Sequence, residues 1–146
     1  RRNCSLPGSP AGMLDLLLKL RNWFLNGFRF GLVTGRASHI VRMRAAELGV
    51  ELVRQGVEEK LPAVQQILAE LQLKPDQVCY VGDDLPDLPP LLHVGLGVAV
   101  ADGAAELCQA AHYVTKAPGG SGAIRETIEM ILKRQGRWED LIQKYK

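Results

Sequence analysis

Short apolar runs alternate with amphipathic segments along most of the chain, and glycine, proline and polar residues separate them. The apolar runs have the length and β-forming composition of buried strands. In the amphipathic segments, apolar residues recur three and four positions apart, which predicts helices. Strands are predicted at 28–34, 50–53, 77–81, 94–100 and 112–115, and helices at 13–26, 38–48, 60–71, 86–92, 104–111, 124–135 and 138–145.

This order of elements predicts an α/β fold, because strands that alternate with helices form a parallel sheet covered on both faces. Residues 1–12 contain two prolines, two glycines and two serines, so they are expected to be loop or disordered. No repeat, low-complexity segment or linker divides the remainder. Residues 13–146 are therefore expected to form a single domain.

Composition excludes several classes of protein. Apolar residues make up 47% of the chain, which is enough for a core, and 18 basic against 16 acidic residues leave no charged block for a nucleic-acid partner. No apolar run is long enough for a membrane span, and the N-terminus lacks the apolar core of a signal peptide, so a cytoplasmic location is expected. Cys4, Cys79 and Cys108 lie far apart and are expected to be reduced thiols.

Polar residues of chemical interest follow three of the predicted strands. Thr34-Gly35-Arg36 follows the first strand, Gly82-Asp83-Asp84 the third, and Ala101-Asp102-Gly103 the fourth. Because ligands of such sheets bind at the carboxyl ends of the strands, these segments are expected to contribute to one site.

The acidic segment is a candidate metal site. Asp83, Asp84 and Asp87 lie within five residues, and their mutual repulsion would be relieved by a cation. Magnesium prefers one or two carboxylates together with water and phosphate oxygens, so Asp83 is the first candidate ligand, with Asp84 and Asp87 behind it. The alternative is a solvated loop in which an aspartate caps the following helix.

Three further segments suit an anion. The Thr34 hydroxyl and the backbone of Gly35 and Arg36 precede a helix and could bind phosphate, or form an ordinary strand-to-helix turn. Lys60 opens a helix, where its charge opposes the helix dipole unless it meets a phosphate; the alternative is a solvent-exposed lysine. The glycine-rich stretch around Gly119-Gly120 could cradle an anion or act as a flexible connector.

Taken together, these motifs resemble the haloacid dehalogenase superfamily, and more closely its 3-deoxy-D-manno-octulosonate 8-phosphate phosphatases. Thr34-Gly35 matches the second motif, which binds phosphate, and Lys60 matches the lysine that neutralises charge. Gly82-Asp83-Asp84, with Asp87, matches the metal-binding motif. The resemblance runs from about Phe30 to the C-terminus and includes Gln55-Gly56-Val57, Val98–Asp102, Tyr113–Gly120 and Gly122–Glu126.

The resemblance implies a Rossmann-like, three-layer sandwich without a large cap domain, often assembled as a homotetramer. It implies a magnesium-dependent reaction that releases phosphate from a small phosphorylated sugar acid of lipopolysaccharide synthesis. Thr34, Gly35, Arg36 and Lys60 would bind the phosphate, and Thr34 and Lys60 would also stabilise the charge that develops during the reaction. Neither a nucleic acid nor a membrane is implied as a partner.

The family's nucleophile motif is not found in the sequence. Family members begin with a strand that ends in Asp-x-Asp-Gly, whose two aspartates act as nucleophile and as general acid and base. The only acidic residue before Thr34 is Asp15. Because that strand lies between the strands ending at Thr34 and near Asp83, a gap of about 10 Å, two strand spacings, is expected. An incomplete sequence, a strand from another chain, and direct pairing of the flanking strands are the explanations considered.

Three functions are therefore compared. The first is a phosphatase of the family type. The second is a catalytically inactive assembly or regulatory module, which the missing aspartates motivate. The third is a phosphoacceptor receiver domain, which is disfavoured because Asp83 and Asp84 follow a late strand rather than a central one.

Overall fold

The computed structural model describes residues 27–146, so the predicted loop at 1–12 and helix at 13–26 lie outside the described residues. The chain divides between Ala69 and Glu70 into two compact units, and each is described by itself. The expectation of a single domain stays a prediction.

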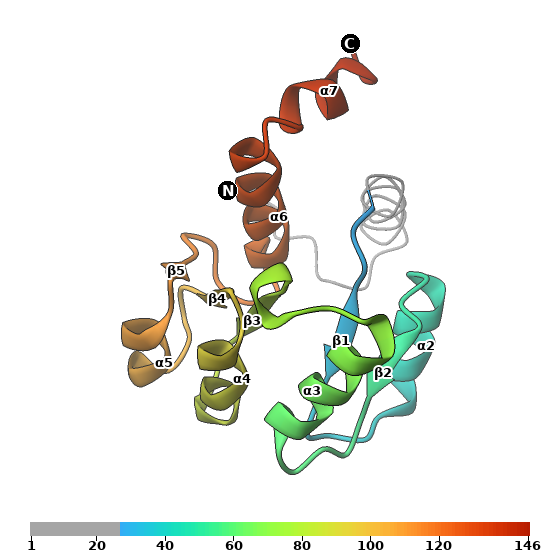
Figure 1. Cartoon of the computed structure of the whole chain (residues 1–146), viewed down its shortest axis with the longest axis vertical. Helices are drawn as coiled ribbons and strands as arrows, with labels where there is room; N and C mark the ends of the chain where they lie inside the picture. The colour runs from blue at the N-terminus through green and yellow to red at the C-terminus, as the bar shows by residue number, and fades with distance from the viewer. Residues whose placement is uncertain (1–26) are drawn as a thin grey trace, which may run out of the picture. The chain divides into compact units, whose positions relative to one another are not determined.

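The first unit is a two-stranded parallel sheet with a helix on either side (Figure 1). Its elements are β1 (Gly31–Val33), α2 (His39–Glu47), β2 (Leu52–Arg54) and α3 (Lys60–Leu71). Leu32 is the ladder partner of Val53. Helix α3 buries Ala63, Val64, Ile67 and Leu68, whose spacing places them on one helical face. That face packs against β1, since Ile67 lies close to Gly31.

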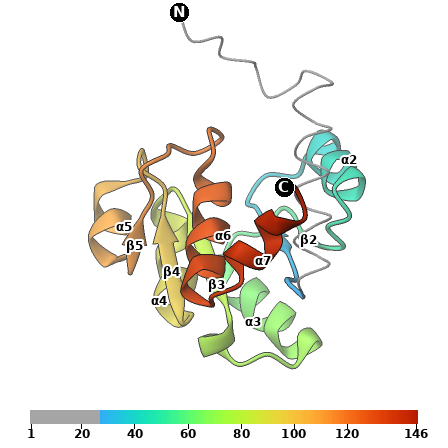
Figure 2. The same cartoon turned by 90° about the horizontal axis from the view of Figure 1, so that it is seen from above.

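The second unit contains a three-stranded parallel sheet in the order β3-β4-β5. Helices α4 and α5 lie on one face of this sheet and α6 on the other (Figures 1 and 2). The elements are η1 (Pro75–Gln77), β3 (Cys79–Gly82), η2 (Leu85–Asp87), α4 (Leu88–His93), β4 (Leu96–Ala99), α5 (Ala105–Ala110), β5 (Tyr113–Val114), α6 (Ala123–Arg134) and α7 (Trp138–Gln143).

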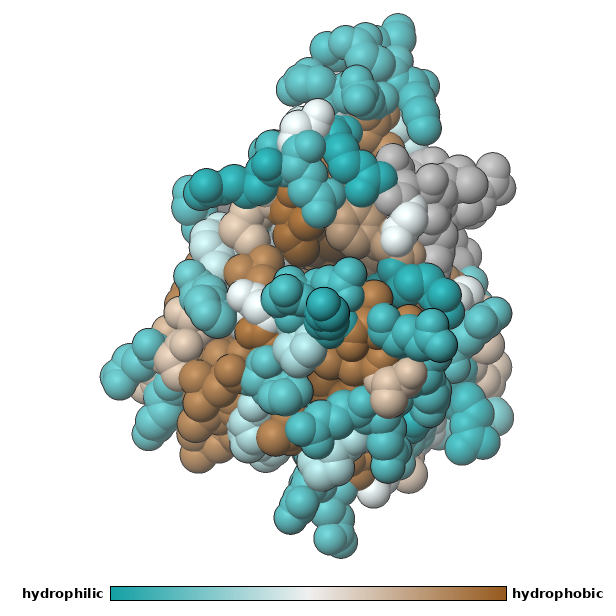
Figure 3. Space-filling view, viewed as in Figure 1, coloured by the Kyte–Doolittle hydropathy of each residue, from teal (hydrophilic) through white to brown (hydrophobic). Residues whose placement is uncertain are grey.

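The core of the second unit is built where α4 and α5 meet β4. Leu91, Ala99 and Leu107 are fully buried there. Gly97 allows the close approach, because a Cβ at this position would lie 2.6 Å from both Cγ and the carbonyl oxygen of Leu91. Helix α4 also carries exposed apolar side chains such as Leu92, and Figure 3 shows hydrophobic surface over this helix.

Each strand and helix predicted between residues 28 and 145 is present; α3 has the predicted bounds, and the other elements have shifted ends. The strand predicted at 28–34 is shortened to Gly31–Val33, because only these residues have ladder partners in β2. The 3₁₀ turns η1 and η2 were not predicted. The described strands form two separate sheets, and no large cap domain is inserted within residues 27–146. Within this part of the chain, every helix is too short or too polar to cross a bilayer.

Candidate active site

The loop after β3 is held by the buried carboxylate of Asp87. Its Oδ2 accepts the backbone N–H groups of Asp83 at 3.1 Å and Asp84 at 3.2 Å, and its Oδ1 accepts the Tyr80 hydroxyl at 2.5 Å. Burial and the hydrogen bond to Asp87 raise the pKa of Tyr80, so its phenol stays protonated and donates. A Cβ on Gly82 would overlap the Asp87 side chain, so only glycine fits at this position.

The three predicted metal candidates therefore lie in different environments. Asp87 is 2% exposed, and its carboxylate oxygens accept hydrogen bonds from Tyr80 and from the loop backbone. Asp83 and Asp84, by contrast, are exposed. Asp84 also caps η2, since its Oδ1 accepts the Leu85 N–H at 2.8 Å. The cap expected by the alternative interpretation is thus present at Asp84, and the interpretation of the segment as a metal site stays a prediction.

These exposed carboxylates have the chemistry that magnesium requires. The ion takes one or two carboxylates and completes its octahedron with water and phosphate oxygens, and Asp83 stands at the strand end in a loop whose backbone is fixed. Asp83 and Asp84 are the residues that could hold it. Among residues 27–146, no three His, Cys, Asp or Glu side chains are grouped as a protein-only metal site.

The loops after β4 and β5 are tied to the same end of the sheet. The Ala104 N–H donates to the Asp83 carbonyl oxygen at 2.9 Å, which joins the β4 loop to the acidic loop. Oδ1 of Asp102 accepts the Gly119 N–H at 2.7 Å and so draws the glycine-rich stretch to the β4 loop. Asp102, which the sequence marked only as a strand-end residue, therefore acts here through the backbone of Gly119.

Glu126 anchors the glycine-rich stretch from its other side. Its carboxylate accepts the N–H groups of Lys116 at 2.8 Å and Ala117 at 2.9 Å, and the Tyr113 hydroxyl at 2.7 Å. The hydrogen bonds from Lys116 and Tyr113 lower the pKa of Glu126. The stretch that sequence reasoning described as an anion cradle or a flexible connector is thus fixed by two carboxylates, those of Asp102 and Glu126.

In the first unit, the backbone of Thr34 is hydrogen-bonded to the segment that leads to Lys60. The Thr34 N–H donates to the Arg54 carbonyl at 2.9 Å, and the Val57 N–H donates to the Thr34 carbonyl at 3.2 Å. The Arg36 N–H donates to Oγ1 of Thr34 at 3.2 Å, which folds the loop back on its own threonine. Lys60 is the first residue of α3 and is partly buried. It lies three residues after Val57, so the Thr34 loop is hydrogen-bonded close to the start of this helix.

The structure thus groups the predicted residues in two sets. Thr34, Gly35, Arg36 and Lys60 belong to the first unit, and the three aspartates belong to the second. Within the second unit, sequence reasoning missed the positioning roles of Tyr80 and Glu126. These roles leave no local pattern, because each hydrogen bond joins residues from different elements.

The parallel strands joined by helices and the acidic loop after β3 define an α/β protein of the class that binds ligands at the carboxyl ends of its strands. The family described as haloacid dehalogenase-like hydrolase matches residues 44–126, more than half of the chain, and the chain belongs to this family.

Curated relatives of the chain within this family share one name. The chain is 46% identical over 108 residues to the 3-deoxy-D-manno-octulosonate 8-phosphate phosphatase KdsC of Yersinia pestis, a match that covers 74% of this chain and 58% of the relative. The corresponding protein of Escherichia coli K12 is 43% identical over 109 residues, covering 75% and 58%. The chain therefore spans somewhat over half the length of the curated relatives it matches.

The chain is also similar to a solved structure of a phosphatase with the same name. The phosphatase of the same name from Moraxella catarrhalis, in complex with magnesium, phosphate and a KDO molecule, superposes with a TM-score of 0.86 at 34% identity. The match covers 91% of this chain and 76% of that one.

Proposed function

We propose that this chain provides the phosphate- and magnesium-binding part of a phosphomonoesterase that acts on 3-deoxy-D-manno-octulosonate 8-phosphate. The observation that carries the proposal is the acidic loop after β3, in which buried Asp87 fixes the backbone of exposed Asp83. The relatives that carry this enzyme's name, and the one whose structure holds magnesium, phosphate and KDO, support the choice of substrate and metal.

Different residues of the chain would bind the phosphate and the metal. Oγ1 of Thr34 accepts a hydrogen bond from Arg36, so the hydroxyl proton remains to donate to a phosphate oxygen. The Lys60 ammonium would neutralise charge on the phosphoryl group, and the Gly35 backbone would allow its close approach. Asp83, with Asp84 beside it, would hold magnesium, whose charge polarises the phosphoryl group when it is bound.

The attacking group must be an aspartate, and the printed sequence contains no Asp-x-Asp-Gly segment. Attack on phosphorus, and the proton transfers that follow, would come from the two aspartates of a strand with that ending placed before β1. A homotetramer and a cytoplasmic location belong to the same proposal and rest on the family resemblance.

The test compares the 146-residue chain with a chain extended at its N-terminus by a strand that ends in Asp-x-Asp-Gly. Phosphate release from 3-deoxy-D-manno-octulosonate 8-phosphate is measured with magnesium, alongside other phosphomonoesters. We expect turnover only from the extended chain, and loss of it when the first aspartate of the extension is replaced by Asn. A folded extended chain without turnover on this substrate would overturn the proposal.

An inactive assembly or regulatory module is the second candidate, favoured by the lack of an Asp-x-Asp-Gly segment in the sequence. It predicts that printed and extended chains form the same stable oligomer in light scattering and that neither releases phosphate. An unfolded or aggregated printed chain would count against it.

A further inference from the structure

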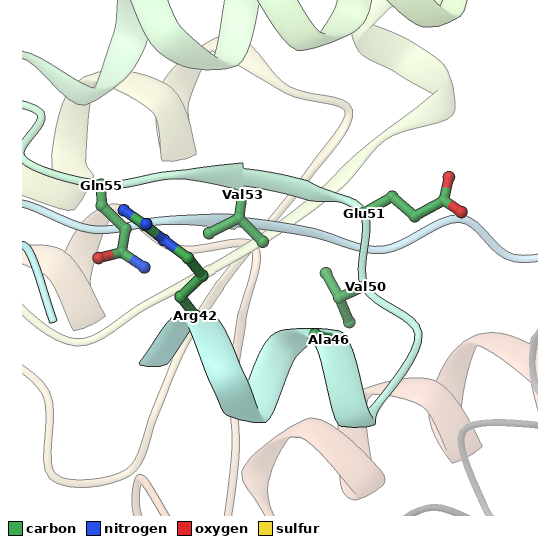
Figure 4. A pocket seen from close by; sticks show the side chains of 6 residues that line it. All are labelled: Arg42, Ala46, Val50, Glu51, Val53 and Gln55. Atoms are coloured by element: carbon green, nitrogen blue, oxygen red, sulfur yellow. The ribbon is translucent and has the colours of Figure 1, made fainter. Parts of the chain in front are cut away.

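A pocket of about 390 Å³ opens between α2 and β2 in the first unit (Figure 4). It is lined by Arg42, Ala46, Val50, Glu51, Val53 and Gln55. Its size lies within the range of small-molecule sites in proteins. The lining is apolar in the middle and polar at both ends, which is the composition that orients a ligand with one polar group.

Gln55 has a buried hydrogen-bond donor beside this pocket that finds no partner within the described residues. Oε1 of Gln55 accepts the Ser38 N–H at 2.7 Å, and this bond determines which end of the amide is the acceptor. The remaining group, Nε2, is buried and finds no hydrogen-bond partner within the described part of the chain. Because a buried donor without a partner is costly, the position favours a ligand that brings an acceptor.

Arg42 adds a positive charge at the same end of the pocket. In Figure 4 the Arg42 and Gln55 side chains lie at one end of the pocket, and the Glu51 carboxylate points away from them. None of the ion pairs within residues 27–146 involves the Arg42 side chain. Guanidinium and amide N–H groups side by side match the two oxygens of a planar carboxylate.

The Glu51 end of the pocket limits the charge that a ligand can carry. Glu51 lines the pocket there, so a second negative charge on the ligand would be repelled. Between the two ends, Ala46, Val50 and Val53 provide an apolar surface for a hydrocarbon chain. A singly charged carboxylate with an apolar tail fits this distribution better than phosphate, which carries more charge and no apolar part.

We infer that the pocket between α2 and β2 binds small monocarboxylates: exposed Arg42 holds the carboxylate, and the buried Nε2 of Gln55 is reached when the Arg42 side chain moves onto the ligand. The site differs from the proposed phosphate site, because Thr34 and Lys60 do not line it. It is nevertheless linked to that loop, since the same Gln55 amide holds the backbone of Ser38 at the start of α2.

The test is a titration of the ¹⁵N-labelled full chain with hexanoate, followed by two-dimensional NMR. Hexanamide, which has the same shape without the charge, and inorganic phosphate are titrated in parallel. We expect saturable shifts of the Arg42, Val53 and Gln55 amide signals with hexanoate and none with the other two. The readout requires no turnover, so its failure and that of the proposed function are distinguishable.

Two substitutions test the assigned contacts. Gln55→Glu keeps an acceptor for Ser38 but removes the donor, and Arg42→Gln removes the charge; each is expected to weaken hexanoate binding at least about tenfold, with the dispersed spectrum retained. Arg44→Gln is the matched control on the same helix, because Arg44 pairs with Glu47 outside the pocket, and it should leave binding unchanged. Equal binding of hexanamide, saturation by phosphate at these signals, or unaltered affinity in folded Gln55→Glu would overturn the inference.

Discussion

Asp87 holds Asp83 through the backbone: Oδ2 of Asp87 accepts the Asp83 N–H at 3.1 Å, across the turn that follows β3. The same carboxylate also accepts the Asp84 N–H and the Tyr80 hydroxyl. The loop that carries the candidate metal ligand is therefore shaped by a residue whose own oxygens face inward.

Replacing Asp87 by Ala should destabilise the protein by about 2–4 kcal/mol, because two backbone N–H groups and the partly buried Tyr80 phenol lose their acceptor. The midpoint of urea unfolding measures this loss. Asp84→Ala is the control in the same loop, and it removes only an exposed cap, so about 1 kcal/mol is expected. Similar losses for the two variants would contradict the role given to Asp87.

Asp83→Asn should weaken magnesium binding at least about tenfold if its carboxylate is a ligand, since an amide oxygen carries no charge for the cation. Calorimetric titration of magnesium into the extended chain described above gives the affinity. Asp140→Asn, on α7, is the control for a general loss of negative charge. Unchanged affinity in Asp83→Asn would remove Asp83 from the metal site.

Gly97→Ala should cost about 1–3 kcal/mol, because the new methyl group overlaps Leu91 where α4 packs on β4. Gly35→Ala is the matched control, since its Cβ would meet only the Val57 carbonyl at 3.4 Å. Chemical denaturation of both variants tests the difference. If Gly97→Ala were as stable as Gly35→Ala, the close approach of α4 to β4 would be wrong.

Stability should fall with acid through Glu126. The pKa of this carboxyl is lowered in the folded state by its hydrogen bonds with Lys116 and Tyr113, so its contribution is present above the ordinary glutamate pKa of about 4.3 and is lost as pH falls through the folded value. The difference in unfolding midpoint between the wild type and Glu126→Gln should therefore shrink from pH 7 to pH 3.

Glu129→Gln is the control for loss of a carboxylate from the same helix, because Glu129 pairs with Arg125 at the surface. At pH 7 it should lower the unfolding midpoint less than Glu126→Gln does, since exposed ion pairs contribute little to stability. A constant difference between wild type and Glu126→Gln across the range would show that the carboxylate form of Glu126 is not the stabilising one.

Most of the fold follows from local pattern. The apolar face of α3 and the strand ending at Gly82 are recognisable in the sequence, since burial imposes a period of 3.6 on helices and a continuous apolar run on parallel strands. The strand before Thr34 was predicted too long, because its length depends on how far its partner β2 extends, which no local signal encodes.

The candidate site was predictable only in part. The positions of Thr34 and Asp83 at strand ends follow from the order of elements. The separate roles of Asp83 and Asp87, four residues apart, do not, because both are aspartates and only the fold turns one outward and the other inward. Gln55 likewise reads as a motif residue, whereas its partner Ser38 lies 17 residues away.

The anchoring of Lys116 and Ala117 by Glu126 constrains where the chain tolerates changes in length. Glu126 lies in the first turn of α6, and one residue inserted between Ala123 and Glu126 would rotate its carboxylate by about 100° around the helix axis, away from both N–H groups. The same insertion beside Gly120, where φ is +72°, leaves the helix and its carboxylate in phase. Natural or engineered insertions in this region should therefore accumulate at the glycines and be absent from the helix start.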